Sequence, residues 1–146
     1  MIRRATLADV PALMDLEKHA VTAAHWSAEQ YEAMFSDARS RLALVLEEQD
    51  VLYGFLVARI IGPEWELENI AIAGSSRRRG LGTRLLAEFL NTARSGGATA
   101  VFLEVRQSNT AARRLYEKWA FAESGRRADY YRDPQEPAIT YRLDFC

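Results

Sequence analysis

Three arginines stand directly before a glycine-x-glycine in the stretch RRRGLG, from Arg77 to Gly82. A strand-like apolar run precedes this stretch and a helix-like run follows it. The first N–H groups of a helix lack internal partners, and the helix dipole adds about half a positive charge there. Glycines at such a turn let the backbone approach a phosphate closely. The stretch therefore predicts a site for a phosphorylated ligand, and the alternative is a solvated, arginine-rich helix start.

A carboxyl group and a phenol further along the chain could move protons. Glu104 alternates with Phe102 and Arg106 on a strand-like run, so the three side chains share one face. Tyr116 lies on a helix-like run, and a phenol with a reference pKa of about 10 can donate a proton at neutral pH. Simpler alternatives stand beside both roles. Glu104 could pair with Arg106 or face solvent, whereas Tyr116 could be a core aromatic beside Leu115.

The bulk composition limits the class of protein. The 146 residues are 49% hydrophobic and 27% charged, which is typical of a soluble globular domain. A net charge of −1 argues against general binding to nucleic acid or membrane surfaces. The single cysteine, Cys146, excludes an internal disulfide framework and leaves no cysteine cluster for a metal. With neither a signal core nor an apolar run of about 18 residues, we expect one soluble, cytoplasmic domain over residues 1–146.

Hydrophobic periodicity and capping motifs predict the elements that position these residues. Helices are expected after Thr6 and Ser27, because Asp9 and Gln30 stand at the capping-box spacing. The elements expected after them, in chain order, are a hairpin over Arg41–Ile61, a strand over Trp65–Ile72, a helix from Leu81 to Gly96-Gly97, a strand over Ala98–Arg106, a helix over Asn109–Trp119 and strands over Phe121–Ser124 and Ile139–Leu143. This order predicts an α/β domain of the α+β type with a mixed sheet.

The motifs and their order resemble the GNAT superfamily of acyl-coenzyme A N-acyltransferases. The resemblance covers nearly the whole chain and is densest from Leu67 to Phe121. That superfamily has a pyrophosphate loop of the form Gln/Arg-x-x-Gly-x-Gly/Ala, which Arg77–Gly82 fits at every fixed position. Residues 103–121, LEVRQSNTAARRLYEKWAF, together with Asn69–Ile72 look most like the ribosomal-protein-alanine N-acetyltransferases. The resemblance implies a mixed, mostly antiparallel central sheet flanked by helices.

The same resemblance implies a role for each candidate residue. Glu104 would be the general base for the acceptor amine, and Tyr116 the general acid for the departing thiolate. Backbone groups of Ile70, Ala71 and Ile72 would pair with the pantetheine arm of acetyl-coenzyme A, and an N–H near Ile72 would polarise the thioester carbonyl. The other implied cofactor contacts are Arg77, Arg78, Arg79, Gly80, Leu81, Gly82, Thr83 and Asn109. Asn109 could equally cap its own helix.

The acceptor implied by the resemblance is a protein N-terminal amine, in particular the N-terminal alanine of the eighteenth small-subunit ribosomal protein. Tyr130 and Tyr131 resemble the family's tyrosine pair near the acceptor, whereas Asp129 and Pro137 depart from the pattern there. With no internal cysteine to carry the acyl group, direct transfer is expected, without a metal. We expect a monomer or weak dimer that acts on a protein partner, with no direct contact to nucleic acid or membrane.

Three alternatives to this function remain open from the sequence. The first is a GNAT acetyltransferase that modifies lysine side chains or a small-molecule amine. The second is a non-catalytic acyl-coenzyme A sensor, which the presence of both Glu104 and Tyr116 disfavours. The third is an RNA-binding module that uses the arginine run. It is disfavoured by the nearly neutral charge and because no aromatic residue stands beside the arginines to stack on bases.

Overall fold

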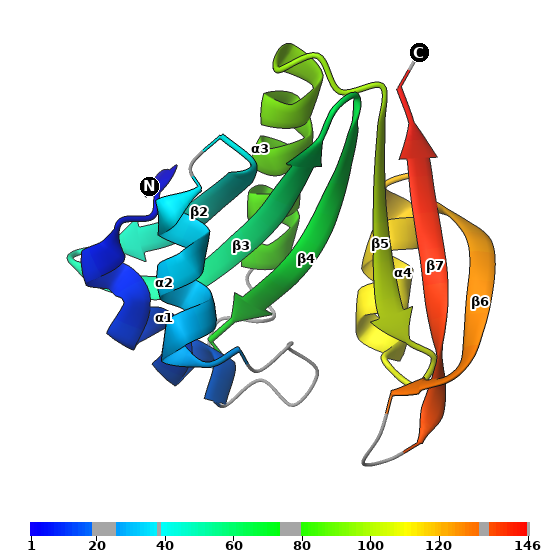
Figure 1. Cartoon of the computed structure of the whole chain (residues 1–146), viewed down its shortest axis with the longest axis horizontal. Coiled ribbons are helices and arrows are strands. Elements are labelled where there is room, and N and C mark those ends of the chain that lie inside the picture. The colour runs from blue at the N-terminus through cyan, green and yellow to red at the C-terminus, as the bar shows by residue number, and fades with distance from the viewer. Residues whose placement is uncertain (19–25, 38, 74–79, 132–134, 146) are drawn as a thin grey trace.

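The computed structural model describes residues 1–18, 26–37, 39–73, 80–131 and 135–145, without the side chains of residues 129 and 131. A seven-stranded sheet with the order β1-β2-β3-β4-β5-β7-β6 forms its centre (Figure 1). The elements are β1 (Ile2–Arg4), the 3-10 helix η1 (Leu7–Asp9), α1 (Val10–Lys18), α2 (Ala28–Ser36), β2 (Arg41–Glu48), β3 (Val51–Ile61), β4 (Glu64–Ile72), α3 (Leu81–Ser95), β5 (Ala100–Arg106), α4 (Thr110–Lys118), β6 (Ala122–Tyr131) and β7 (Glu136–Asp144). Neighbouring strands are antiparallel except β4 and β5, which are parallel. The predicted mixed, mostly antiparallel α/β fold is therefore confirmed.

Helices cover both faces of the sheet, with α1 and α2 on one face and α3 and α4 on the other (Figure 1). Apolar residues recur every three or four positions along α3, so one stripe of the helix faces the sheet. The buried residues of this stripe are Leu81, Leu85, Leu86, Phe89, Leu90 and Ala93. On the opposite face, a second core joins the α1 and α2 side chains to β2, β3 and β4 through Val10, Leu13, Tyr31, Met34, Val45, Phe55, Val57 and Ala71.

The start of α2 has the capping box that the sequence predicts. The Gln30 backbone N–H donates to Ser27 Oγ at 3.2 Å, and the Ser27 N–H donates to Gln30 Oε1 at 2.7 Å. Trp26 and Tyr31 pack across this helix start with ring centroids 5.4 Å apart. These contacts satisfy donors that a helix start otherwise leaves without partners, and they fix the direction in which the chain enters α2.

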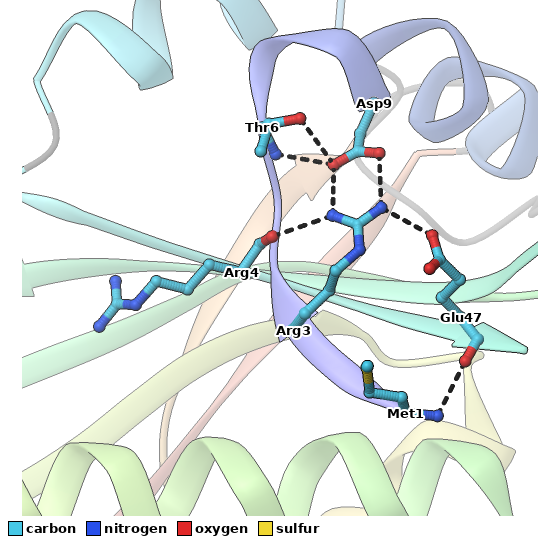
Figure 2. Close-up of polar contacts among 6 residues, drawn as sticks. All are labelled: Met1, Arg3, Arg4, Thr6, Asp9 and Glu47. Carbon is cyan, nitrogen blue, oxygen red and sulfur yellow. Dashed lines mark hydrogen bonds and ion pairs between the residues drawn. The ribbon is translucent and has the colours of Figure 1, made fainter. Parts of the chain in front are cut away.

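Hydrogen bonds from the Arg3 side chain hold the N-terminus against the sheet (Figure 2). Arg3 donates from both terminal nitrogens to the Asp9 carboxylate, at 2.9 and 3.0 Å, and also to Glu47 Oε2 at 2.8 Å. The Thr6 N–H donates to Asp9 Oδ2 at 2.7 Å, so the predicted box is present, although the chain first makes η1 and only then α1. Hydrogen bonds from Arg3 are the main reason that the pKa of Asp9 lies below its usual value.

The last two strands are longer than the sequence predicts. β6 reaches Tyr131, whereas the prediction ended at Ser124, and β7 lies between β5 and β6. Residues 122–128 and 130 are all exposed, so β6 has no alternation of apolar and polar residues to mark its length. Pairing with β7, and not burial, defines this edge strand, with a register irregularity between Glu123 and Gly125.

Candidate functional site

The parallel strands β4 and β5 form a fork. Their register runs from Glu64 opposite Ala100 to Leu67 opposite Leu103 and ends there in the described part of the chain. Beyond that pair the two strands separate toward their carboxyl ends (Figure 1). A bulge on β4 coincides with the separation, because the partners on β3 shift between Leu67 and Asn69. The mouth of the fork thus begins at the next residue of each strand.

Backbone groups of β4 face into this fork. The Ala73 N–H donates to the Tyr53 carbonyl of β3 at 2.8 Å. Because N–H groups alternate in direction along a strand, those of Ile70 and Ile72 point away from β3 and toward the side of β5. Ala71 directs its backbone to β3, opposite Phe55. Of the three residues predicted to contact the cofactor, Ile70 and Ile72 therefore have the backbone orientation that a ligand in the fork would require.

The start of α3 lies beside the end of β4. Gly80 caps the helix in the left-handed conformation, with φ +72°, and a Cβ at this exposed position would meet nothing within 4 Å. A Cβ on Gly82 would lie 3.7 Å from Ile72 Cγ1 and 3.8 Å from Leu115 Cδ2. The end of β4, the start of α3 and the helix α4 thus meet at Gly82. The predicted contacts Arg77–Arg79 lie outside the described residues.

The remaining predicted cofactor contacts have different surroundings. Leu81 is buried in the core and can offer a ligand only its backbone, whereas Thr83 is half-buried. Asn109 caps α4, because its Oδ1 accepts from the Ala112 N–H at 3.2 Å. Of the two interpretations of Asn109, capping is the one that the structure displays.

Glu104 is the β5 residue at the mouth of the fork. It is half-buried and shares a face with Phe102 and Arg106, as predicted. Its Oε1 lies 3.5 Å from Arg127 Nε. The Arg127 guanidinium lies over the Tyr130 ring, 4.9 Å from its centroid, which is within the range of about 6 Å for a cation–π contact. Tyr130 is 49% exposed. The predicted base and one predicted acceptor-binding tyrosine are therefore connected through a residue, Arg127, that the sequence did not single out.

Two carboxyl groups of β4 form an acidic surface on the side of Glu104, and one of them, Glu66, interacts with Glu104. Burial and the neighbouring charges of Glu68 and Glu104 raise the pKa of Glu66. Burial also raises the pKa of Glu68, against the effect of Arg41, whose Nε lies 2.8 Å from Glu68 Oε1. Sequence reasoning missed this acidic surface, although alternation in the segment WELE, residues 65–68, already placed Glu66 and Glu68 on one face.

A buried polar network anchors β4 just before Ile70. Asn69 Nδ2 donates to Glu17 Oε1 at 2.8 Å, and the backbone N–H of Trp26 donates to the same oxygen at 2.9 Å. Glu17 and Asn69 are both almost fully buried, so each requires such partners. The network joins α1, the approach to α2 and the strand that faces the fork.

Tyr116 lies on the other face of the sheet. It is 4% exposed, and its ring centroid lies 5.7 Å from that of Phe121 and 6.2 Å from that of Tyr141. The interpretation as a core aromatic therefore describes its packing, and this packing is compatible with a hydroxyl that serves the fork. The carboxylate of Glu104 and the ring of Tyr116 thus lie on opposite sides of the sheet.

The described residues contain no group of three or more His, Cys, Asp or Glu side chains that could hold a metal ion. Within the same ranges, no helix has both the length and the apolar character needed to cross a membrane.

The fork between β4 and β5, with a glycine-capped helix beside it, defines the class. The family model for the acetyltransferase (GNAT) family matches residues 10–121, and the chain belongs to this family. It is an acetyl-coenzyme A-dependent N-acetyltransferase.

Within this family, the chain is similar to several individual proteins. The chain is 36% identical over 138 residues to the [ribosomal protein bS18]-alanine N-acetyltransferase of Salmonella typhimurium, covering 92% of this chain and 90% of the relative. The crystal structure of the ribosomal-protein-S18-alanine N-acetyltransferase from Escherichia coli superposes with a TM-score of 0.88 at 30% identity, covering 99% and 92% of the two chains. Ard1 from Thermoplasma volcanium has the same fold, with a TM-score of 0.91 at 23% identity.

Proposed function

We propose that this enzyme transfers the acetyl group of acetyl-coenzyme A to a protein N-terminal amine, and that its acceptor is the N-terminal alanine of ribosomal protein bS18. The acceptor is supported by the activity for which the Salmonella and Escherichia coli relatives are named. The chemistry is supported chiefly by one observation: a Cβ on Gly82 would lie 3.7 Å from Ile72 Cγ1 and 3.8 Å from Leu115 Cδ2. The proposed cofactor strand, phosphate-binding turn and acid-bearing helix thus meet at one point. Residues 1–146 would act as one domain.

The acetyl-coenzyme A site would follow the edge of β4 to the start of α3. The N–H groups of Ile70 and Ile72 are oriented to pair with an extended amide chain, as an added strand would. The open, left-handed Gly80 and the first N–H groups of α3 suit the pyrophosphate. The residues present therefore fit the co-substrate, with Arg77–Arg79 and Thr83 as further proposed contacts.

Glu104 and Tyr116 would carry the protons of the transfer. As the amine nitrogen bonds to the carbonyl carbon and the carbon–sulfur bond breaks, Glu104 accepts the proton of the amine, directly or through water. Tyr116 donates its proton to the departing thiolate, and the N–H of Ile72 stabilises the oxyanion. Because the two side chains lie on opposite faces, the amine would enter from the α1–α2 side and the thiolate would leave on the α4 side.

The surface around Glu104 suits a cationic acceptor. A free α-amino group has a reference pKa of about 7.7–8.0 and is mostly protonated at neutral pH. The charges of Glu68 and Glu104 both act on Glu66, and burial raises the pKa of Glu66 and Glu68. An approaching ammonium group would relieve this clustering of carboxyl groups. Tyr130, and with it Tyr131, would contact the first residues of the acceptor.

Matched peptides distinguish the proposed acceptor from the lysine-modifying alternative. The enzyme is incubated with acetyl-coenzyme A and a peptide that begins with the alanine of bS18 and contains an internal lysine. A second peptide has the same sequence with its N-terminus blocked. Mass spectrometry should find acetylation at the N-terminus of the first peptide and little on the second. Acetylation of the lysine alone in both peptides would refute the proposed acceptor.

Conservative substitutions test the proposed proton carriers. Removing a general acid or base typically lowers turnover by about 10²–10⁴-fold, so Tyr116→Phe and Glu104→Gln should each lower kcat within this range. Binding of acetyl-coenzyme A to Tyr116→Phe should stay within about twofold of wild type, because the ring and its packing remain. Asn91→Ala, an exposed substitution on α3, serves as the control and should retain full turnover. Unchanged kcat for Tyr116→Phe would exclude it as the acid.

A further inference from the structure

Tyr141 connects two elements of the proposed site: the paired strands β5 and β7, which include Glu104, and the helix α4, which includes Tyr116. It lies on β7, which pairs with β5 so that Tyr141 is opposite Leu103 and Thr140 is opposite Glu104. Its side chain is fully buried in the core on the α3–α4 face. One buried residue therefore touches the helix of the proposed acid while its backbone is fixed beside the proposed base.

The Tyr141 hydroxyl makes hydrogen bonds to two residues of α4. Arg113 Nε donates to the hydroxyl at 3.0 Å, and the hydroxyl donates to Glu117 Oε2 at 2.7 Å. Residues 113 and 117 are four apart, so they lie one above the other on the same helix face. Tyr116 neighbours that face, and its ring centroid lies 6.2 Å from that of Tyr141. The hydrogen bonds of the hydroxyl thus restrain α4 against rotation about its axis and against movement away from β7.

Arg113 extends the same network to the loop after β5. Its terminal nitrogen Nη1 donates to the Gln107 carbonyl at 3.0 Å, three residues beyond Glu104. Its Nη2 lies 3.9 Å from Glu123 Oε2 on β6. The side chain that donates to Tyr141 therefore also joins α4 to the loop after β5 and to the edge strand.

The position of α4 depends on few buried side chains. Of its nine residues Tyr116 is the one that is buried, while Ala112 and Leu115 are half-buried and pack against the core. A side-chain atom about 6 Å from a helix axis moves about 1 Å when the helix rotates by about 10°. A displacement of about 1 Å at a reacting group can cost about 10²-fold in rate.

We propose that Tyr141 is a positioning residue, whose hydroxyl holds α4 so that Tyr116 reaches the sulfur of the leaving thiolate while Glu104 faces the amine. This inference rests on the proposed role of Tyr116 as general acid. Tyr141 touches neither substrate nor cofactor and acts through Tyr116. Substitution of Tyr141 should therefore slow the chemical step and leave the binding of both substrates almost unchanged.

Tyr141→Phe tests this proposal because it removes the hydroxyl and keeps the ring. We expect kcat to fall about tenfold, as for the loss of one well-placed hydrogen bond. The KM values for acetyl-coenzyme A and for the acceptor peptide should each stay within about twofold. Glu117→Gln, an exposed substitution at the other end of the same hydrogen bond, should lower kcat in the same direction and serves if Tyr141→Phe does not fold. Val45→Ala, in the core of the opposite face, controls for general destabilisation and should leave kcat unchanged.

A double-mutant cycle separates positioning from a merely structural effect. If Tyr141 acts through the Tyr116 hydroxyl, Tyr141→Phe should lower kcat less than about twofold when Tyr116 is already Phe. Equal fold-losses in the two backgrounds would overturn the positioning role and leave the acid assignment intact. A Tyr116→Phe single variant with wild-type kcat would instead refute the acid assignment, and the positioning role would fall with it. Unchanged kcat for both Tyr141→Phe and Glu117→Gln would also overturn the proposal.

Discussion

Gly82→Ala is predicted to make the protein more stable and a poorer binder of acetyl-coenzyme A. The added Cβ would lie 3.7 Å from Ile72 Cγ1 and 3.8 Å from Leu115 Cδ2, which are ordinary van der Waals distances. Gly82 is the second residue of α3, so alanine suits its backbone conformation. Replacing glycine by alanine at a compatible position raises the free energy of unfolding by about 0.4–1 kcal/mol. For a chain of this size the melting temperature should therefore rise by about 1–4 °C.

In the proposed phosphate site, the same methyl group would hinder the approach of a phosphate to the backbone N–H groups of the α3 start. Losing one hydrogen bond to a charged group costs about 1.5–3 kcal/mol, which corresponds to a rise in Kd of about 10- to 150-fold. Gly82→Val should weaken binding further, because its branched methyl groups extend toward Ile72 and Leu115, and it should weaken binding more than Arg78→Ala. Alanine is the sharper test because it separates binding from stability.

Calorimetric titration with acetyl-coenzyme A would give Kd, and thermal unfolding without ligand would give the melting temperature. Asn91→Ala is the matched control, because it adds a better helix former to an exposed position of α3. It should raise the melting temperature with an unchanged Kd. If Gly82→Ala gains stability but binds acetyl-coenzyme A as wild type does, the glycine is needed only for the helix and the phosphate-cradle argument is wrong.

Two further predictions concern stability. Arg3 holds the pKa of Asp9 below its unfolded value of about 3.9. The Arg3–Asp9 contact therefore stabilises the fold above that pH, and this stabilisation is lost as the pH falls through the folded pKa. Asp9→Asn should lower the melting temperature at pH 7, and the difference in melting temperature from wild type should shrink toward pH 2. A difference that stays constant with pH would contradict this. Ser27→Ala removes the acceptor that caps α2 and should lower the free energy of unfolding in urea by about 1 kcal/mol, whereas exposed Ser36→Ala at the other end of α2 should cost less.

The elements that sequence patterns predict well are those with one buried face. The α3 stripe from Leu81 to Ala93 recurs at helical spacing, and the Ser27–Gln30 box marks the start of α2. β6 lacks such a signal because nearly all of its described side chains are exposed. The insertion of β7 between β5 and β6 depends on long-range strand pairing, which local periodicity does not encode.

The candidate site likewise has features that sequence patterns predict and features that they do not. Motif spacing made Glu104 and Tyr116 the candidate proton carriers, which stay predictions, and strand alternation gave the face of Glu104 correctly. Sequence patterns could not predict that Arg127 lies 3.5 Å from Glu104, because the two residues meet through β6 and β7. Nor could they single out Tyr141, whose proposed role depends on hydrogen bonds to a helix 24 and 28 residues earlier in the chain. Side-chain contacts between elements far apart in the sequence could be found only from the structure.

We propose above all that this acetyltransferase modifies the N-terminal alanine of ribosomal protein bS18. The most direct measurement is mass spectrometry of bS18 from ribosomes of the source cells, with and without the gene for this chain. We predict that the N-terminal alanine carries an acetyl group when the wild-type enzyme is present and loses it when the gene is absent or encodes Tyr116→Phe. An N-terminus whose acetylation does not depend on the gene would contradict the account.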